Sequence, residues 1–193
     1  MPRYSSDISE ILYEEDVSKM LARARSPKEA YLIAILWITG ARPSEALELK
    51  KNSFRLENGT LKIYLFTKKL GKTNDFIIRG RTLDFERPDG YGANQYIEQI
   101  IAFVNGSADE GFILPYTTRW AEKVINRLGM EALNKLISPY HFRHSVLSHH
   151  ASKGMNTVDL MAFKGAKSIG SVAPYLHAKP FTVKAKDLER ARL

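Results

Sequence analysis

The sequence predicts an α+β fold that is mostly helical, with one small three-stranded antiparallel sheet inserted between helices. Three observations support this class. Apolar residues recur every three or four positions through most of the chain, which is the period of an amphipathic helix. Between residues 54 and 78 the pattern changes to short β-rich runs separated by turn signals. No repeat, low-complexity tract or long linker divides the 193 residues, so we expect one domain over residues 1–193.

Three helices are expected in the first fifty residues. Residues 13–25 place apolar side chains at helical spacing, with a charged outer face. Ser26-Pro27-Lys28-Glu29 has the pattern of a capping box with proline in the first turn, and should open a very apolar helix over residues 27–38. Gly40 can end that helix, and Pro43 should begin the next because its fixed φ suits a first helical turn.

The middle of the chain has the signals of a small sheet. Strands are expected at residues 54–56, 61–67 and 76–78. Asn58-Gly59 is a strong tight-turn signal, and residues 70–74 form a looser one. Helical patterns return at residues 93–104, 118–128 and 139–153.

The composition narrows the classes of partner and cofactor. With 29 Lys and Arg against 21 Asp and Glu, the formal net charge is +8, which suits DNA, RNA or a membrane surface better than an acidic protein. There is no cysteine, so disulfides, thiolate catalysis and cysteine-ligated zinc are excluded. No apolar run approaches the roughly 20 residues that span a bilayer, and the first residues lack a secretory signal. We therefore expect a soluble, cytoplasmic protein.

Two arginines stand in settings that suit anion binding. Arg42 lies between a glycine that can end one helix and a proline that can begin the next, so its side chain and nearby free backbone N–H groups could bind one anion. Arg143 falls in the first two turns after Ser138-Pro139, with Tyr140 three residues back on the same helical face. Each arginine taken alone could equally pack on a helix end or lie on the surface.

The order of these features is more specific than any one of them. Thr39-Gly40-Ala41-Arg42-Pro43-Ser44-Glu45 is followed by a basic hairpin, then by Tyr140-His141-Phe142-Arg143-His144, and last by Gly165-Ala166-Lys167-Ser168-Ile169-Gly170-Ser171 with Tyr175 beyond it. Over about residues 13–177 the sequence resembles the catalytic domain of the tyrosine recombinase (phage integrase) family. The resemblance implies an enzyme that acts on double-stranded DNA, at the nucleoid of the host cell, without a metal or any other cofactor.

The activity that the resemblance implies is site-specific recombination or integration. In this family a tyrosine hydroxyl attacks a backbone phosphate and leaves a 3′-phosphotyrosyl link, which a second 5′-hydroxyl then reseals. By motif position the nucleophile is Tyr175, and the arginines that bind the phosphate are Arg42 and Arg143. Guanidiniums suit this role because they stay charged and offer forked donors to the phosphorane oxygens.

A lysine on the β-hairpin gives the departing 5′-oxygen its proton in the family. Thr67-Lys68-Lys69 occupies that place. A threonine or serine often precedes the family lysine, which favours Lys68, whereas the spacing from Arg42 fits Lys69 as well. Lys72 in the turn is a third candidate, and all three lysines could instead contact the DNA backbone. His141 is a further expected DNA contact.

Two family positions are filled differently in this chain. Tyr140 stands three residues before the second arginine, where the family commonly has the histidine that accepts the nucleophile's proton, although archaeal and viral members tolerate other residues there. Ala166 follows Gly165, where histidine or tryptophan usually steadies the phosphate. We expect Lys164 or Lys167 to take over part of that phosphate contact.

The resemblance also raises the question of assembly. Most members carry an N-terminal helical domain that completes a clamp around DNA, and residues 1–193 are interpreted as the catalytic domain without it. Residues 178–193 form a basic tail, which in relatives docks on the next protomer. A recombination synapse implies a DNA-bound homotetramer, while the free chain can be a monomer. Pro174 should loosen the chain before Tyr175, which leaves open delivery of the tyrosine to a neighbouring protomer.

Two other functions compete with recombination. A type IB topoisomerase resembles this family in its tyrosine and arginine chemistry but relaxes supercoils instead of exchanging strands. A DNA-binding relative without catalysis is the other alternative, and Tyr140 and Ala166 favour it. The retention of Arg42, Arg143, a hairpin lysine and Tyr175 argues against such a loss.

Overall fold

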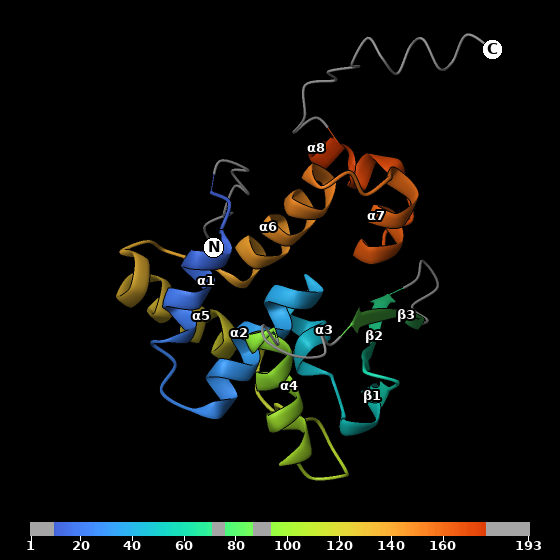
Figure 1. The fold of residues 1–193 in the computed structure, drawn as a ribbon. Coiled ribbons are helices and arrows are strands. Elements are labelled where there is room, and N and C mark those ends of the chain that lie inside the picture. The colour runs from blue at the N-terminus through green and yellow to red at the C-terminus, as the bar shows by residue number, and fades with distance from the viewer. Residues whose placement is uncertain (1–9, 71–75, 87–93, 177–193) are drawn as a thin grey trace, which may run out of the picture.

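The computed structural model describes residues 10–70, 76–86 and 94–176, and the expected mostly helical α+β class is confirmed (Figure 1). The helices are α1 (Glu14–Leu21), α2 (Pro27–Thr39), α3 (Pro43–Leu47), α4 (Gln95–Asn105), α5 (Thr118–Leu133), α6 (Pro139–Ser152), α7 (Thr157–Lys164) and α8 (Ala173–Leu176). Single 3-10 turns, η1 (Lys51–Ser53) and η2 (Ile169–Ser171), precede β1 and α8. The strands are β1 (Phe54–Glu57), β2 (Thr60–Leu70) and β3 (Phe76–Glu86).

Helix α2 lies at the centre of the main core. Almost every side chain from residue 30 to residue 39 is buried, because other helices pack around α2 on several sides. Gly40 ends α2 in the left-handed region, at φ +54°, as expected. A Cβ at Gly40 would lie 3.3 Å from Val146 of α6, so the glycine also allows α6 to pack closely on this helix end.

The capping box predicted at the start of α2 does not form, so that prediction is wrong. The Ser26 side chain makes no cap hydrogen bond. The carboxylate of Glu29 accepts instead from the backbone N–H of Arg25, at 2.7 Å. It also pairs with Arg127 of α5 at 2.7 Å, and this tertiary partner draws the carboxylate away from the position that a capping box requires.

The sheet has the order β1-β2-β3, and both pairings are antiparallel. The tight turn at Asn58-Gly59 is confirmed, because both residues adopt positive φ, at 48° and 76°. Leu61, Ile63 and Leu65 alternate along β2 and are buried against the helices. The opposite face carries Tyr64 and Phe66 towards solvent, and Phe66 is 48% exposed. The sheet therefore covers the core with one face only.

Strand β3 is much longer than the three residues that the sequence predicts. It pairs with β2 along its whole length, from Phe76 opposite Leu70 to Glu86 opposite Thr60. The stretch from residue 79 to residue 82 reads Arg-Gly-Arg-Thr, which has no apolar alternation to mark a strand. Backbone pairing with β2 holds these polar residues in the sheet.

The later helices match the sequence in kind and differ at their ends. Helix α4 starts at Gln95, where the Asn94 side chain accepts from the backbone N–H of Tyr96. Helix α5 continues past the expected end at residue 128 and includes Gly129, where a Cβ would lie 2.7 Å from Ile137. Helix α6 forms as expected. Helices α7 and α8 were not predicted, because eight and four residues are too few to establish a clear period.

A second, smaller core lies beside the main one. Leu147 of α6 packs there with Leu160 of α7, Val172 and Tyr175. Helix α6 belongs to both cores, and Figure 1 shows it running from the main body towards α7 and α8 at the top of the view. Helix α6 thus connects the short final helices to the main core, and α7 also lies against β3.

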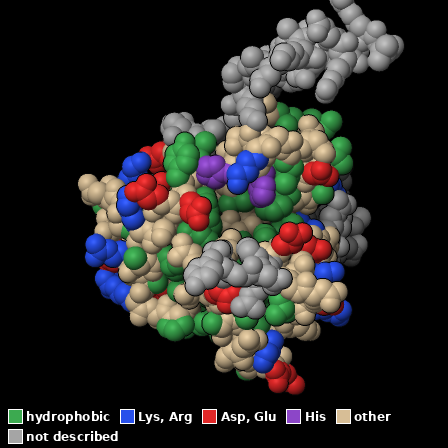
Figure 2. All heavy atoms as spheres, in the orientation of Figure 1, with side chains coloured by type: hydrophobic (Ala, Val, Ile, Leu, Met, Phe, Trp, Pro, Cys, Tyr) green, Lys and Arg blue, Asp and Glu red, His purple; other side chains and the backbone are tan. Residues whose placement is uncertain are grey.

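Two surface properties bear on the kind of partner. Among the described residues, no helix is long and apolar enough to cross a membrane. On the face that Figure 2 shows, Lys and Arg side chains are interspersed with Asp and Glu and form no continuous basic patch. The positive charge that matters for the site lies instead in a partly buried group of arginines.

Candidate active site

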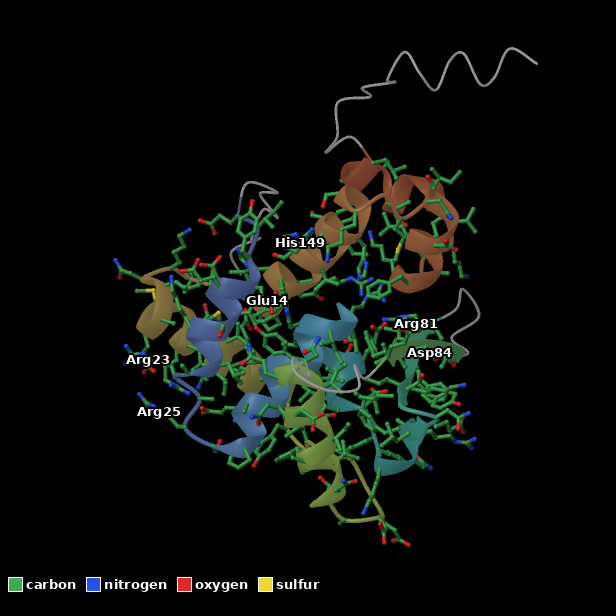
Figure 3. The ribbon with its side chains drawn as sticks, viewed as in Figure 1. Glu14, Arg23, Arg25, Arg81, Asp84 and His149 are labelled. Carbon is green, nitrogen blue, oxygen red and sulfur yellow. The ribbon has the colours of Figure 1, made fainter. Side chains whose placement is uncertain are left out.

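Glu45 brings two arginines together at the start of α3. Arg42 is the N-cap residue of α3, and its Nη1 donates to Oε1 of Glu45 at 2.7 Å. Arg81 of β3 reaches the same carboxylate and donates from Nη2 to Oε2 at 2.8 Å. Figure 3 shows Arg81 where the sheet meets the helical part of the molecule. The Glu45 side chain is only 2% exposed, so this carboxylate is shielded from water and fixes both guanidiniums.

Arg143 of α6 lies next to this pair. It is 5% exposed, and it donates from Nη1 to the carbonyl oxygen of Gly40 at 2.6 Å and from Nη2 to that of Lys164 at 2.7 Å. Burial lowers the pKa of Arg143 to about 10, with a further lowering by the charge of Arg42, so the guanidinium stays charged at neutral pH. Carbonyl oxygens at the ends of α2 and α7 therefore hold Arg143, the second arginine expected to bind the phosphate, beside Arg42.

Arg42, Arg81, Arg143 and Glu45 together form the arginine cluster. Three positive charges and one negative charge give 3 − 1 = +2 in a largely buried group. Like charges confined in a poorly solvated place repel each other, and a phosphate oxygen would relieve that repulsion. The cluster has the donor geometry and the surplus charge of an anion site.

Lys164 extends the cluster at the end of α7. Burial lowers its pKa to about 8, with smaller effects in the same direction from Arg143 and Arg42. Its Nζ donates to the carbonyl oxygen of Ser171 and lies 4.9 Å from the centroid of the Tyr175 ring. Of the two lysines expected near the phosphate, Lys164 lies beside the arginines, whereas Lys167 is exposed in the segment after α7.

Gly165 allows α7 to end close to β3. Its φ of +65° lies in the left-handed region, and a Cβ there would lie 2.9 Å from Nη1 of Arg81. Ala166, at the position where the family usually has histidine or tryptophan, packs against the second core. The phosphate contact of that family side chain therefore has no counterpart at position 166.

Tyr175 is buried at 4% exposure and belongs to the second core. Its hydroxyl lies 2.8 Å from Nδ1 of His144. Burial raises the pKa of the phenol, and the positive charge of Arg143 opposes that rise. Pro174 does not loosen the chain, because it lies in the first turn of α8, where proline is tolerated.

The other expected site residues are less closely involved. Tyr140 is 54% exposed in the first turn of α6. His141 has partners for both ring nitrogens inside the chain: Nδ1 lies 2.8 Å from the Ser138 hydroxyl, and Nε2 lies 3.4 Å from a carboxylate oxygen of Glu10. His141 therefore caps α6, and its contact with DNA stays a prediction.

The hairpin lysines are placed by strand register. Lys68 pairs with Ile78 and Lys69 with Ile77, near the end of the β2–β3 hairpin. Lys72 lies outside the described residues. In the part of the chain that the structure describes, no group of His, Asp and Glu side chains could hold a metal ion.

Three residues of the site were not found by the sequence reasoning, namely Glu45, Arg81 and His144. Glu45 lies three residues after Arg42, and His144 directly follows Arg143, so both were present in the quoted motifs. Their roles needed the fold, because carboxylates are mostly exposed and histidines are of intermediate burial, so the motif alone does not indicate a buried contact. Arg81 had no sequence signal, since only the pairing of β3 with β2 brings it to Glu45.

Comparison with known proteins agrees with this fold. Residues 10–180 match the model of the phage integrase family. The tyrosine recombinase XerD of Staphylococcus haemolyticus is 24% identical over 187 residues, which cover 91% of this chain and 60% of that protein. XerD of Listeria innocua is 23% identical over 205 residues, covering 95% of this chain and 63% of that protein.

Solved structures show the same fold. The XerH site-specific recombinase, in a pre-cleavage complex with its difH substrate, has a TM-score of 0.66 at 21% identity, covering 94% of this chain and 52% of XerH. The XerA recombinase has a TM-score of 0.67 at 16% identity, covering 95% and 65% of the two chains. The catalytic domain of bacteriophage HP1 integrase has a TM-score of 0.61 at 22% identity, covering 94% and 92%.

The fold of the described residues is that of the recombinase and integrase structures reported above. The chain belongs to the phage integrase family, because the family model matches most of its length. It spans about 60% of the length of the curated relatives reported above.

Proposed function

We propose that this chain is the catalytic domain of a site-specific DNA recombinase or integrase, which breaks and rejoins strands through a 3′-phosphotyrosyl intermediate. One observation carries the proposal, namely the surplus positive charge of the arginine cluster beside Tyr175. Membership of the phage integrase family supports it. The substrate is double-stranded DNA, by analogy with the difH complex of XerH.

The geometry supports a division of roles. Arg143 and Arg42 would bind the non-bridging oxygens of the scissile phosphate, where negative charge grows in the phosphorane. Glu45 holds Arg42 and Arg81 in place. Lys164 would add a third cationic contact and compensate in part for Ala166, and Lys167 would contact the flanking DNA backbone. Tyr175 would attack the phosphorus, and the phosphodiester energy would stay in the covalent link, so no nucleotide cofactor is needed.

The leaving 5′-oxygen needs a proton, which we assign to a lysine of the β2–β3 hairpin. Side chains alternate between the two faces of a strand. Position 69 therefore belongs to the same face of β2 as the buried Leu65. Leu65 pairs with Arg81, so this is the face towards the arginine cluster. Position 68 has the register of the exposed Phe66. The register favours Lys69 as the general acid and leaves Lys68 for contact with the DNA backbone.

The wider assembly is part of the same proposal. Residues 1–193 act as one catalytic domain, with the basic segment 178–193 contacting a neighbouring protomer, and a homotetramer forms on DNA during synapsis. The free chain would be a monomer. Binding should weaken steeply with salt, because cations that contact phosphates release counterions from DNA.

The test is capture of the covalent intermediate. DNA selected from a random pool by binding to the chain is prepared with a 5′-bridging phosphorothiolate, whose departing thiolate cannot reseal the strand. Peptide mapping should find the 3′-phosphoryl group on Tyr175, and Tyr175→Phe should give no adduct. DNA binding without any adduct would support the non-catalytic alternative. Relaxation of supercoils without recombinant junctions between two selected sites would support the topoisomerase alternative.

A further inference from the structure

We propose that His144 is the base that removes the phenolic proton from Tyr175, an inference that rests on the function proposed above. Nδ1 of His144 lies 2.8 Å from the Tyr175 hydroxyl oxygen. The two rings are tilted by 32°, with 5.8 Å between their centroids. His144 therefore touches the atom that attacks the phosphate.

The surroundings of His144 favour a neutral ring. Burial lowers its pKa, and so do the nearby positive charges of Lys164 on α7 and of His141 and Arg143 on α6. A lowered pKa means that the imidazole is unprotonated at neutral pH. A neutral ring with its proton on Nε2 has a lone pair on Nδ1, the nitrogen that faces the phenol.

Tyr175 needs such a base. Burial raises the pKa of its phenol, and the charge of Arg143 opposes that effect. At neutral pH the phenol is therefore protonated, and a protonated phenol is a weak nucleophile. A base in hydrogen-bond contact removes the proton as the attack proceeds, so that no free phenolate has to form first.

The position of His144 also accounts for the unusual residue at position 140. Tyr140 occupies the place of the usual family histidine, and it is 54% exposed. His144 lies four residues further along α6, one turn away on the same helical face. The chain thus presents an imidazole to the nucleophile from the next turn of the same helix.

The proton balance of the step is as follows. A lone pair of the Tyr175 oxygen forms the bond to phosphorus while the bond from phosphorus to the 5′-oxygen breaks. The phenolic proton passes to Nδ1 of His144, which becomes an imidazolium, and the hairpin lysine gives its proton to the 5′-oxygen. In resealing, the oxygen of a 5′-hydroxyl forms a bond to phosphorus while the bond from phosphorus to the Tyr175 oxygen breaks. The hydroxyl proton passes to the lysine, and the imidazolium gives its proton to the departing Tyr175 oxygen.

The test compares His144→Gln with His150→Gln. His150 is a matched control because it is also half-buried on α6, with its pKa lowered by burial, but its ring packs against Phe163 at 4.5 Å between centroids. With phosphorothiolate DNA no general acid is needed, so the adduct rate reports on the base. His144→Gln should slow adduct formation by about 100-fold or more, and His150→Gln should leave it unchanged.

Two further readouts distinguish a base from a structural role. Imidazole in the buffer should restore part of the rate of His144→Ala, and the defect of His144→Gln should shrink as rising pH ionises the phenol. A His144→Gln protein that reacts at the wild-type rate would overturn the inference. So would a defect that neither imidazole nor high pH relieves.

A measurement on the DNA-free chain separates this inference from the proposed function. Long-range 1H–15N correlation spectra report which imidazole nitrogen carries the proton. We expect the proton of His144 on Nε2, and a proton on Nδ1 would overturn the inference whatever the activity. Absence of adduct from the wild-type chain and from His150→Gln alike would instead refute the proposed function, and the assignment of a base with it.

Discussion

At the scale of single residues, Glu45 joins two arginines of the arginine cluster through one carboxylate. Its buried carboxylate accepts hydrogen bonds from Arg42 and Arg81, and its negative charge opposes the lowering of the Arg143 pKa by burial and by the charge of Arg42. A buried charged group is costly unless it is paired. The carboxylate thus holds the guanidiniums of Arg42 and Arg81 in their observed orientation.

Glu45→Gln should therefore destabilise the fold. The amide keeps the size of the side chain but loses the charge, and one oxygen becomes a donor that cannot accept from arginine. We expect a loss of about 3 kcal/mol in the free energy of unfolding, measured by urea denaturation. Glu131→Gln is the control, because its carboxylate is 32% exposed and pairs with the exposed Arg25 and with Arg127 on the same helix. It should change stability by less than about 1 kcal/mol. Equal effects of the two changes would contradict this prediction.

Lys164 should take up a proton when DNA binds. Its pKa is lowered to about 8 by burial, Arg143 and Arg42, so near pH 8 much of the amine is neutral in the free chain. A phosphate beside it stabilises the ammonium form and raises the pKa. Calorimetric titration at pH 8, in buffers of different ionisation enthalpy, should detect this proton uptake. Lys164→Met should abolish it, and a change at the exposed Lys153 should not.

At the scale of elements, the proposed role of the β2–β3 hairpin is to bring a lysine to the scissile phosphate. The register places position 69 on the face of Arg81 and position 68 on the opposite face. Lys69→Ala should slow cleavage of ordinary DNA by about 100-fold or more, and phosphorothiolate DNA should restore the rate, because a thiolate departs without a proton. Lys68→Ala should weaken DNA binding with little effect on cleavage of bound DNA. The reverse pattern would identify Lys68 as the acid.

Helices were predictable from the sequence where their pattern was long and regular. The apolar run of residues 30–38 predicted α2, and Ser138-Pro139 predicted the start of α6, which carries Arg143 and His144. Asn58-Gly59 predicted the first hairpin turn. Much of β3 was not predicted, because its middle residues are polar. Helices α7 and α8 were not predicted, because they are short. Their conformations depend on partners distant in sequence, such as β2 for β3 and α6 for α8.

At the scale of the whole molecule, we expect the proposed cleavage to use the tyrosine of the same chain. Tyr175 packs into the second core and contacts His144 of its own α6, and the charge of its own Arg143 acts on it. Mixing Tyr175→Phe with Arg42→Ala protein should therefore restore no cleavage. Each variant assayed alone provides the baseline. Recovery of a sizeable fraction of wild-type adduct would show that the tyrosine is delivered between chains.

The sequence alone determined the fold class, the family resemblance and the positions of Arg42, Arg143 and Tyr175, because helix periods, turn residues and ordered motifs are local signals. Only the tertiary structure decided that Arg81 joins Glu45, that Lys164 lies beside the arginines and that His144 meets the nucleophile. Each of these contacts joins residues from separate elements. These contacts form because folding buries charged and polar groups beside one another, where they must pair. A local sequence pattern does not indicate which distant residues will meet.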